Sequence, residues 1–214
     1  MDKSMVEVVD VWKKYEEHGD WVLKGIDLSV PESEKVFILG ANGSGKTTLI
    51  KIIAGLIRPS KGKVSILGIE PYYPEAKSLM GVVLHTSLVY SPLTVEENLL
   101  FYAKLFGVND YSPENDEIVE ILKLKAKINE KVASLSFGWR RRVDIARALI
   151  HKPSVLLLDE PFTGLDDTGV SDLITVLDMH TSRGGVVIAT APKETDIGPL
   201  KDVRVLKLEG GRLR

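Results

Sequence analysis

The segment that decides the fold of this chain runs Val36-Phe37-Ile38-Leu39-Gly40-Ala41-Asn42-Gly43-Ser44-Gly45-Lys46-Thr47. Its apolar beginning, Val36 to Leu39, predicts a strand that is covered on both faces. The part from Gly40 onward matches the pattern G-x-x-x-x-G-K-[ST] at every fixed position. A helical pattern follows from Thr47 to Leu56, so the glycine-rich turn lies between a strand and a helix. In this arrangement backbone N–H groups and a helix N-terminus bind a phosphate.

The residue types of this loop suit a nucleoside triphosphate. Glycines let successive backbone N–H groups turn inward, and we expect Lys46 to reach the β and γ phosphates. We expect Thr47 Oγ1 to bind Mg²⁺. The segment predicted to bind nucleotide consists of Gly40, Ala41, Asn42, Gly43, Ser44, Gly45, Lys46, Thr47 and Thr48. The predicted cofactors are therefore ATP and Mg²⁺.

A second buried strand, Val155 to Leu158, ends in the acidic pair Asp159-Glu160. We expect this strand to lie beside the strand that leads into the phosphate loop. Asp159 would then hold the metal, directly or through water, and Glu160 would polarise the water that attacks the γ-phosphate. The sequence thus predicts Glu160 and Lys46 as catalytic residues, and Thr47 and Asp159 as metal ligands.

Composition is that of an ordinary soluble domain. The chain has 214 residues, of which 44% are apolar and 27% charged, a net charge of −2 and no cysteine. One domain is the default at this length, and the charge gives no electrostatic footprint for nucleic acid. The opening residues Met1 to Ser4 lack the apolar segment of a secretory signal, and no apolar stretch reaches the roughly 20 residues that span a bilayer. We therefore expect a cytoplasmic protein that meets a membrane only through a partner.

The hydrophobic pattern divides the chain into three parts. The first third alternates apolar and polar residues and predicts half-buried strands. The middle is helical, with a capping box at Thr94 to Glu97, a helix from Val95 to Phe106 and another from Ser112-Pro113 to Lys125. The last third alternates strands and helices, as in a parallel sheet, and Gly210-Gly211 marks a hairpin. The predicted fold class is α/β.

Two further motifs give the chain a family resemblance. The run Leu135-Ser136-Phe137-Gly138, which continues as a helix to Leu149, resembles the signature motif of ABC proteins, and Asp159 to Asp166 resembles Walker B running into the D-loop. The resemblance covers nearly the whole chain. A small-molecule kinase would share the phosphate loop but has no use for a signature. DNA- or ribosome-associated ABC proteins generally carry two cassettes or long insertions, and this chain shows neither.

The resemblance implies further site residues. Tyr15 stands where the family stacks an aromatic ring on adenine. Ser136 and the N–H of Gly138 would clamp the ATP that a second subunit holds, while Leu165 and Asp166 of the D-loop would lie at the interface. The signature residues that would act in trans are Leu135, Ser136, Phe137 and Gly138.

Three positions depart from the family's pattern. The Q-loop glutamine is replaced by His85 or Thr86, depending on where a one-residue gap is placed, and the switch histidine is replaced by Ala191. Because these positions sense the γ-phosphate, we expect their loss to slow turnover more than binding. Trp139 stands where the family usually has glutamine, and we expect it to pack within the lobe. Residues 140–142, all arginine, are expected to form a solvated or phosphate-facing helix start.

The resemblance implies a single ATP-binding domain over residues 1–214: a P-loop NTPase (RecA-like) core at 1–85 and 151–214, with an N-terminal antiparallel β portion and an inserted helical lobe at 86–150. The function implied is that of an ABC transporter ATP-binding subunit at the cytoplasmic side of the cell membrane. Its partners would be a membrane permease and a second ATP-binding subunit, identical or different. The stretch from Gly81 to Leu105 looks most like exporter subunits of the haem-exporter and drug-resistance type. The alternative is a catalytically degenerate subunit that pairs with an active one.

Overall fold

The larger of two sheets forms the centre of the protein in the computed structural model, which describes residues 4–214. Its six strands follow the order β5-β6-β7-β3-β8-β9. All neighbours in it are parallel except the terminal hairpin of β8 and β9. The strands are β3 (Lys35–Leu39), β5 (Met80–Val83), β6 (Val155–Leu158), β7 (Val186–Ala191), β8 (Val203–Glu209) and β9 (Arg212–Leu213). The α/β fold class with a mainly parallel sheet is confirmed, as is the hairpin at Gly210-Gly211.

The smaller sheet is antiparallel and contains the N-terminal part of the chain. It consists of β1 (Ser4–Lys13) between β2 (Leu23–Pro31) and β4 (Lys61–Ile66). Val8 lies opposite both Leu28 and Val64. The expected antiparallel portion is therefore present, whereas the charged residues 1–3 lie outside the described chain.

Residues of the central strands alternate between two hydrophobic cores because successive side chains of a strand point to opposite faces. In β3, Val36 and Ile38 join the core between the two sheets and helix α1 (Lys46–Ile53). Phe37 and Leu39 join the core formed with the helices on the other face. Both faces are covered, which explains why the strand reads as a continuously apolar run.

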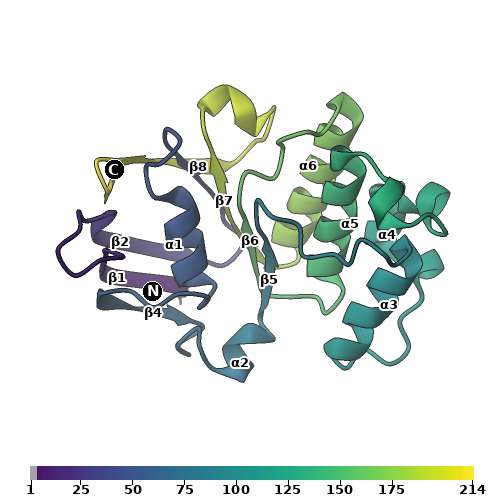
Figure 1. The fold of residues 1–214 in the computed structure, drawn as a ribbon, viewed down its shortest axis with the longest axis horizontal. Coiled ribbons are helices and arrows are strands. Elements are labelled where there is room, and N and C mark those ends of the chain that lie inside the picture. The colour runs from purple at the N-terminus through teal and green to yellow at the C-terminus, as the bar shows by residue number, and fades with distance from the viewer. Residues whose placement is uncertain (1–3) are drawn as a thin grey trace.

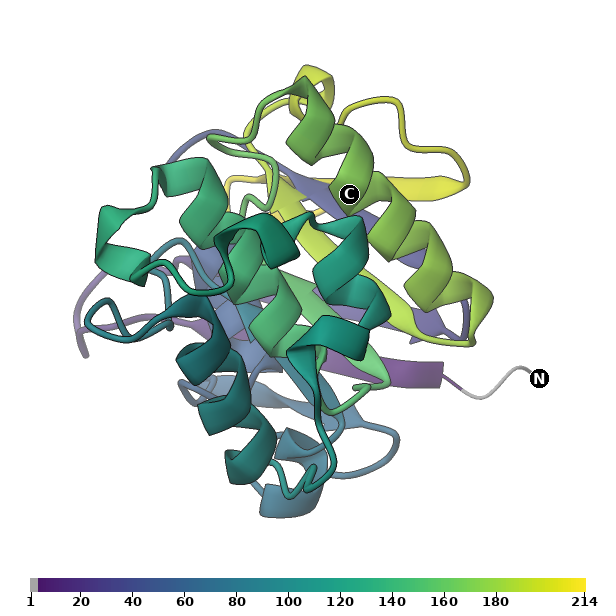
Figure 2. The same ribbon diagram turned by 90° about the vertical axis from the view of Figure 1, so that its right-hand side faces the viewer.

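The remaining helices gather on one side of the central sheet. Figure 1 shows α3 to α6 on the side of β5 and β6 away from the small sheet, and Figure 2 shows them in front of the sheets. The helices are α2 (Pro74–Lys77), α3 (Val95–Leu105), α4 (Glu117–Ile121), α5 (Phe137–Leu149) and α6 (Asp167–Ser182), with 3-10 turns at Pro113–Asn115, Leu124–Lys127, Val132–Ser134 and Glu194–Ile197. Within residues 4–214, no helix combines the length and the apolar character needed to span a membrane.

The predictions for the helical region succeed at its start and fail further on. The capping box is present: Thr94 accepts from the N–H of Glu97, whose side chain accepts from the N–H of Thr94. The continuous helix from Ser112 to Lys125 is wrong. Asp116 is extended and caps a separate short helix by accepting from the N–H of Val119, and Lys123 adopts a left-handed conformation with φ of 58°. Local capping chemistry therefore interrupts a helix that periodicity alone predicts.

Helix α5 packs directly on β5, the edge strand of the central sheet. A Cβ on Gly81 would lie 2.3 Å from the carbonyl oxygen of Ala148, so the close approach requires glycine. The solvated helix start predicted for residues 140–142 is wrong for two of its three arginines, because Arg141 and Arg142 are 3% and 4% exposed. Both are buried because they bond backbone carbonyls and carboxylates of neighbouring segments.

His151 joins the end of α5 to two other elements. Its ring stacks on Phe106 with centroids 3.8 Å apart, and its Nε2–H donates to the carbonyl of Met80 at 3.1 Å. Burial lowers the pKa of His151 from 6.5 to about 4. The native structure therefore favours the neutral ring.

This low pKa predicts a loss of stability in mild acid. Between pH 6.5 and about 4 the unfolded chain binds a proton at His151 that the folded chain does not, so stability is complete above pH 6.5 and falls as the pH decreases toward 4. We expect His151 to account for about 2 kcal/mol of the decrease in unfolding free energy between pH 7.5 and 5, and His151→Phe to remove that component. Urea unfolding at both pH values measures it, with the exposed His18→Gln as control. An unchanged pH dependence in His151→Phe would contradict the assignment.

Candidate functional site

The glycine-rich loop connects β3 to α1 at the carboxyl edge of the central sheet. Gly45 has φ of 105° and precedes the first turn of α1, which no side chain among residues 4–214 caps. Lys46 Nζ lies inside the loop and donates to the carbonyls of Gly40 at 2.7 Å and Ala41 at 3.3 Å. The loop thus combines an uncapped helix N-terminus with a buried ammonium group, a combination that suits a polyanion.

The acidic pair Asp159-Glu160 lies at the same edge, but its strand is not where the sequence analysis placed it. Strand β7 lies between β6 and β3, so the expectation of adjacent strands is wrong. The side chains nevertheless meet because carboxyl ends of parallel strands share one edge of the sheet. Thr47 Oγ1 donates to Asp159 Oδ2 at 2.8 Å, and Glu160 Oε1 lies 3.5 Å from Lys46 Nζ.

The intervening strand contributes Thr190, which the sequence analysis missed. Its fully buried hydroxyl donates to Asp159 Oδ1 at 2.7 Å and accepts from the backbone N–H of Glu160 at 3.0 Å. One hydroxyl therefore orients both acidic residues. A polar residue at the end of an apolar strand is the sequence signal that could have pointed to it.

A cavity of about 340 Å³ opens over these groups. It is lined by Val22, Asn42, Gly43, Gly45, Lys46, Thr47, Thr48, His85, Asp159 and Glu160. His85 is the Q-loop candidate that reaches this cavity, whereas both His85 and Thr86 line a neighbouring groove. The substitution at the γ-phosphate-sensing position is thus histidine in geometric terms.

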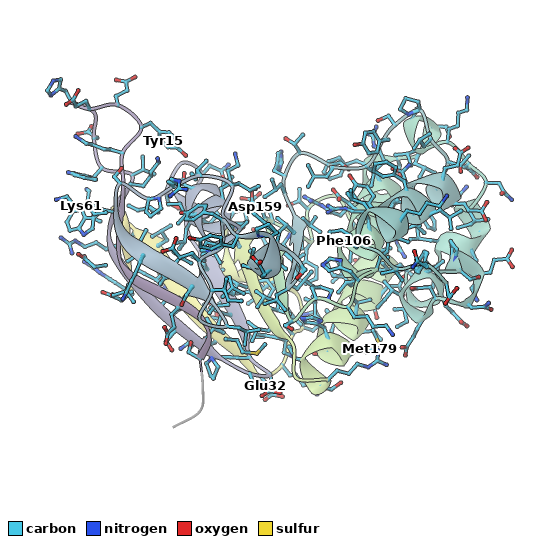
Figure 3. All side chains as sticks on the ribbon, turned by 90° about the horizontal axis from the view of Figure 1, so that it is seen from below. Tyr15, Glu32, Lys61, Phe106, Asp159 and Met179 are labelled. Carbon is cyan, nitrogen blue, oxygen red and sulfur yellow. The ribbon has the colours of Figure 1, made fainter. Side chains whose placement is uncertain are left out.

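Tyr15 stands beside the loop rather than in the cavity wall. It is 63% exposed, and its hydroxyl lies 3.0 Å from Thr48 Oγ1 at the start of α1. Figure 3 shows Tyr15 and Asp159 toward the same end of the molecule, with Glu32 and Met179 at the opposite end. An exposed ring held next to the phosphate loop is available to a flat ligand.

The donor set fits Mg²⁺ bound together with phosphates. Within residues 4–214, no group of three or more acidic, histidine or cysteine side chains could hold a metal alone. Magnesium usually takes one or two protein oxygens plus phosphate oxygens and water, and Thr47 and Asp159 supply such oxygens side by side. Ser44 Oγ is buried and finds no hydrogen-bond partner in the described chain, so a polar group for a ligand stands ready beside them.

The signature residues are not part of this cavity. Leu135 to Gly138 lie at the start of α5, where Ser136 caps the helix by accepting from the N–H of Trp139 at 3.4 Å. Trp139 itself is partly buried against the helical core, as expected. One chain therefore separates its phosphate loop from its signature segment.

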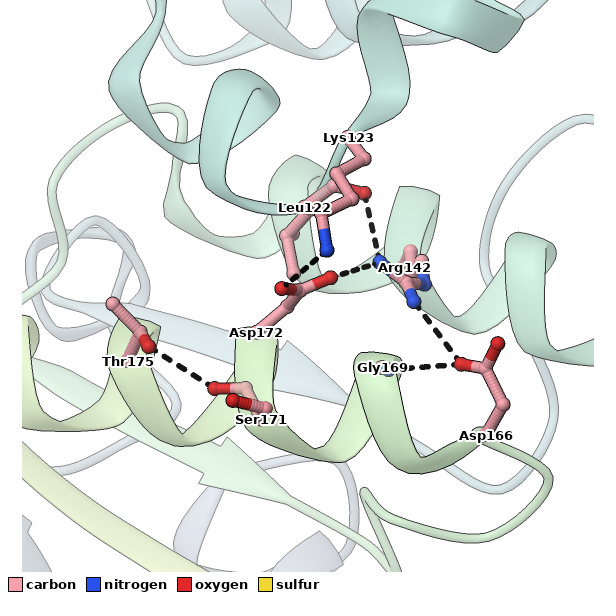
Figure 4. Close-up of polar contacts among 8 residues, drawn as sticks. All are labelled: Leu122, Lys123, Arg142, Asp166, Gly169, Ser171, Asp172 and Thr175. Atoms are coloured by element: carbon pink, nitrogen blue, oxygen red, sulfur yellow. Dashed lines mark hydrogen bonds and ion pairs between the residues drawn. The ribbon is translucent and has the colours of Figure 1, made fainter.

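The D-loop is tied to α5 by an ion-pair network that Figure 4 shows. Asp166 caps α6 by accepting from the N–H of Gly169 at 2.8 Å, and Arg142 donates to the same oxygen at 3.1 Å. The Gly169 N–H and Arg142 hold the pKa of Asp166 below its ordinary value. Arg142 also contacts Asp172, which pairs with Lys123 at 3.0 Å. Leu165, the other predicted D-loop residue, is partly buried against the helical core.

Ala191, at the switch position, ends β7 beside Leu39. Its carbonyl accepts from the N–H of Gly40 at 3.2 Å, and its methyl group is 2% exposed. The position lies next to the phosphate loop, but its side chain offers a ligand no polar group.

Three curated relatives resemble this chain over most of its length. It is 35% identical to the Nod factor export ATP-binding protein I of Rhizobium etli over 99% of this chain and 67% of that protein. It is 36% identical to the cytochrome c biogenesis ATP-binding export protein CcmA of Chelativorans sp. over 81% of this chain and 85% of that protein. It is 34% identical to the bacitracin transport ATP-binding protein BcrA of Bacillus licheniformis over 79% of this chain, but spans only 55% of that protein. The resemblance to exporter and drug-resistance subunits is thereby confirmed.

A solved structure and a family model agree with these relatives. The dimeric structure of an ATP-binding cassette in a post-hydrolysis state, bound to ADP and phosphate, superposes with a TM-score of 0.84 and 28% identity, covering 98% of this chain and 97% of that one. The family model described as ABC transporter matches residues 23–163. The chain therefore belongs to the ABC transporter family, in its class of ATP-binding subunits.

Proposed function

We propose that this chain binds Mg·ATP in the cavity beside the phosphate loop and hydrolyses it slowly, as the motor subunit of an export transporter. The observation that carries the proposal is the meeting of Lys46, Thr47, Asp159 and Glu160 around one cavity of about 340 Å³. Lys46 neutralises the β and γ phosphates, the N–H groups at the start of α1 bind them, and Tyr15 stacks on adenine. The family name of the relatives, ATP-binding protein, supports the same ligand.

Glu160 is the general base in this proposal. Its carboxylate lies at the cavity wall, 3.5 Å from Lys46 Nζ, where it accepts a proton from the attacking water. Thr47 and Asp159 hold Mg²⁺, which when bound neutralises charge on the phosphates. Thr190 keeps Asp159 and Glu160 in register, because its one hydroxyl bonds to both.

Turnover is slow because one γ-phosphate contact is altered and another is missing. His85 replaces the glutamine at the cavity wall, and an imidazole nitrogen either accepts or donates a hydrogen bond there. Ala191 offers no donor at all. Loss of one positioned donor typically lowers a rate by about 10²–10³, while the contacts that bind the phosphates persist.

The role of Glu160 predicts a clean separation of hydrolysis from binding. Glu160→Gln should lower kcat for ATP at least about a hundredfold while leaving the calorimetric affinity for Mg·ATP within about threefold, because the amide cannot take the proton. Phosphate release by the purified chain measures kcat, with the exposed Glu75→Gln on α2 as control. Equal phosphate release by wild type and Glu160→Gln would sink the proposal of hydrolysis.

The proposed working state is a head-to-tail dimer with two ATP molecules at its interface. Each cavity is open in one chain, and the segment from Leu135 to Gly138 of a second chain would complete it, with Ser136 and the N–H of Gly138 bonding the γ-phosphate. The dimer of the related cassette supports this arrangement. The second chain is identical or a different cassette.

The permease partner would dock beside the Q-loop segment, placing the chain at the cytoplasmic side of the membrane. A groove of about 280 Å³ between the core (residues 1–85 and 151–214) and the helical lobe (86–150) lies there. Next to it, four large apolar side chains are exposed: Leu88, Tyr90, Phe101 and Leu105. Exposed apolar side chains that gather in this way suit a protein partner. The cargo is exported in this proposal, in line with the names of the relatives.

Dimerisation tests the role assigned to the signature. Glu160→Gln should dimerise on size-exclusion chromatography only with ATP present. Adding Ser136→Ala should weaken that dimer about tenfold without changing ATP affinity of the monomer, because a charge-assisted hydrogen bond contributes roughly 1.5 kcal/mol or more. Lys46→Ala serves as control, since it should lose both. A Ser136→Ala dimer as tight as its parent would contradict a role in trans, and dimers formed only with a different cassette would identify a heterodimer.

A further inference from the structure

Helix α5 presents a row of polar side chains, three residues apart, to the end of β5. Arg147 donates to the carbonyl of Val82 at 2.8 Å and Arg141 to that of Leu84 at 2.7 Å. Further along, Asp144 accepts from the N–H of Leu88 at 3.1 Å. Because β5 is an edge strand, carbonyls on its open side have no strand partner, and the two guanidinium groups satisfy them. This row explains why α5 stays fixed along the Q-loop segment.

Arg141 differs from Arg147 in one contact. Its second terminal nitrogen donates to the carbonyl oxygen of Glu160 at 3.3 Å, so its guanidinium bridges the end of β5 and the end of β6. The hydrogen bonds of Arg147 within the described chain go to Val82 and Asp144. Two chemically identical side chains on one helix therefore differ in whether they reach the proposed general base.

The backbone of Glu160 needs such support. Its φ is 50°, a left-handed conformation that costs a residue with a Cβ roughly 1–2 kcal/mol. That conformation persists only where neighbours hold it. On one side the N–H of Glu160 donates to Thr190, and on the other its carbonyl accepts from Arg141. Both polar groups of this residue's backbone are thus held by side chains, one from the core and one from α5.

We propose that Arg141 is a positioning residue for ATP hydrolysis, which holds the strained backbone of Glu160 so that its carboxylate faces the attacking water. The inference rests on the proposed role of Glu160 and adds a residue to it. Arg141 does not line the nucleotide cavity as the structure describes it, so it acts through Glu160 and not on the nucleotide. Its loss should therefore change kcat and leave nucleotide binding in place.

Arg141 also connects the groove to the site. It lines the groove between core and lobe together with His85 and Phe137, and its ring neighbour Phe137 lies 5.7 Å from the guanidinium carbon. Its Nε–H is buried and has no hydrogen-bond partner within residues 4–214. A partner segment that offers this N–H an acceptor would shift a side chain that directly contacts Glu160. Occupancy of the groove thus reaches the general base through a single residue.

The chain supplies its own control for this proposal. Arg141→Gln and Arg147→Gln each remove one buried guanidinium from α5 and free one carbonyl of β5, so both should lower the melting temperature. Only the first should release the Glu160 backbone. We expect kcat for ATP in Arg141→Gln to be at least about tenfold lower than in Arg147→Gln, because small displacements of a catalytic group cost rates of that order. KM and calorimetric affinity should stay within about twofold of wild type.

Arg141→Lys and Arg147→Lys keep the charge and one donor, and carry the comparison if a glutamine variant does not fold. A single ammonium group cannot reproduce the guanidinium fork, so Arg141→Lys should lose about threefold or more in kcat relative to Arg147→Lys. Equal kcat in the paired variants, or a loss confined to KM, would overturn the positioning role while leaving the proposed function intact. Wild-type hydrolysis no faster than that of Glu160→Gln would overturn both.

Discussion

The site depends on the contact between the hydroxyl of Thr47 and the carboxylate of Asp159, which joins the start of α1 to the end of β6. These residues come from strands that are not neighbours, and β7 separates them. Thr190, at the end of β7, fills the gap by bonding the second oxygen of Asp159 and the backbone of Glu160. Three strand ends are thus held in one register by short hydroxyl–carboxylate contacts, and the cavity exists because that register holds.

The helical side of the molecule is attached to this centre by buried charges rather than by apolar packing alone. Arginine side chains of α5 bond the open carbonyls of β5 and the acidic residues of the D-loop. A buried guanidinium that loses its partners is costly, so these contacts fix the orientation of α5 once it has docked. The glycine at position 81 is the steric condition for that docking, since α5 lies too close for a side chain.

The geometry of a single chain explains why the protein is best understood as half of a machine. Its phosphate loop and acidic pair meet, but the signature segment starts a helix elsewhere and contributes nothing to the cavity described in residues 4–214. The substituted positions sharpen this view: His85 retains a polar group at the cavity wall, while Ala191 retains only a backbone contact to the loop. Binding groups are therefore more complete than the groups that sense the γ-phosphate.

Sequence by itself determined the phosphate loop, the acidic strand end, the capping box at Thr94 and the α/β class, because each is encoded in residues adjacent along the chain. It did not reveal that β7 separates β6 from β3, that residues 112–125 break into short segments, or that Arg141 and Arg142 are buried. Nor did it point to Thr190 or to the contact of Arg141 with Glu160. Those features arise from contacts between residues 19 to 31 positions apart or more. Only the packed chain decides them, because strand order and burial follow from which surfaces meet and not from local pattern.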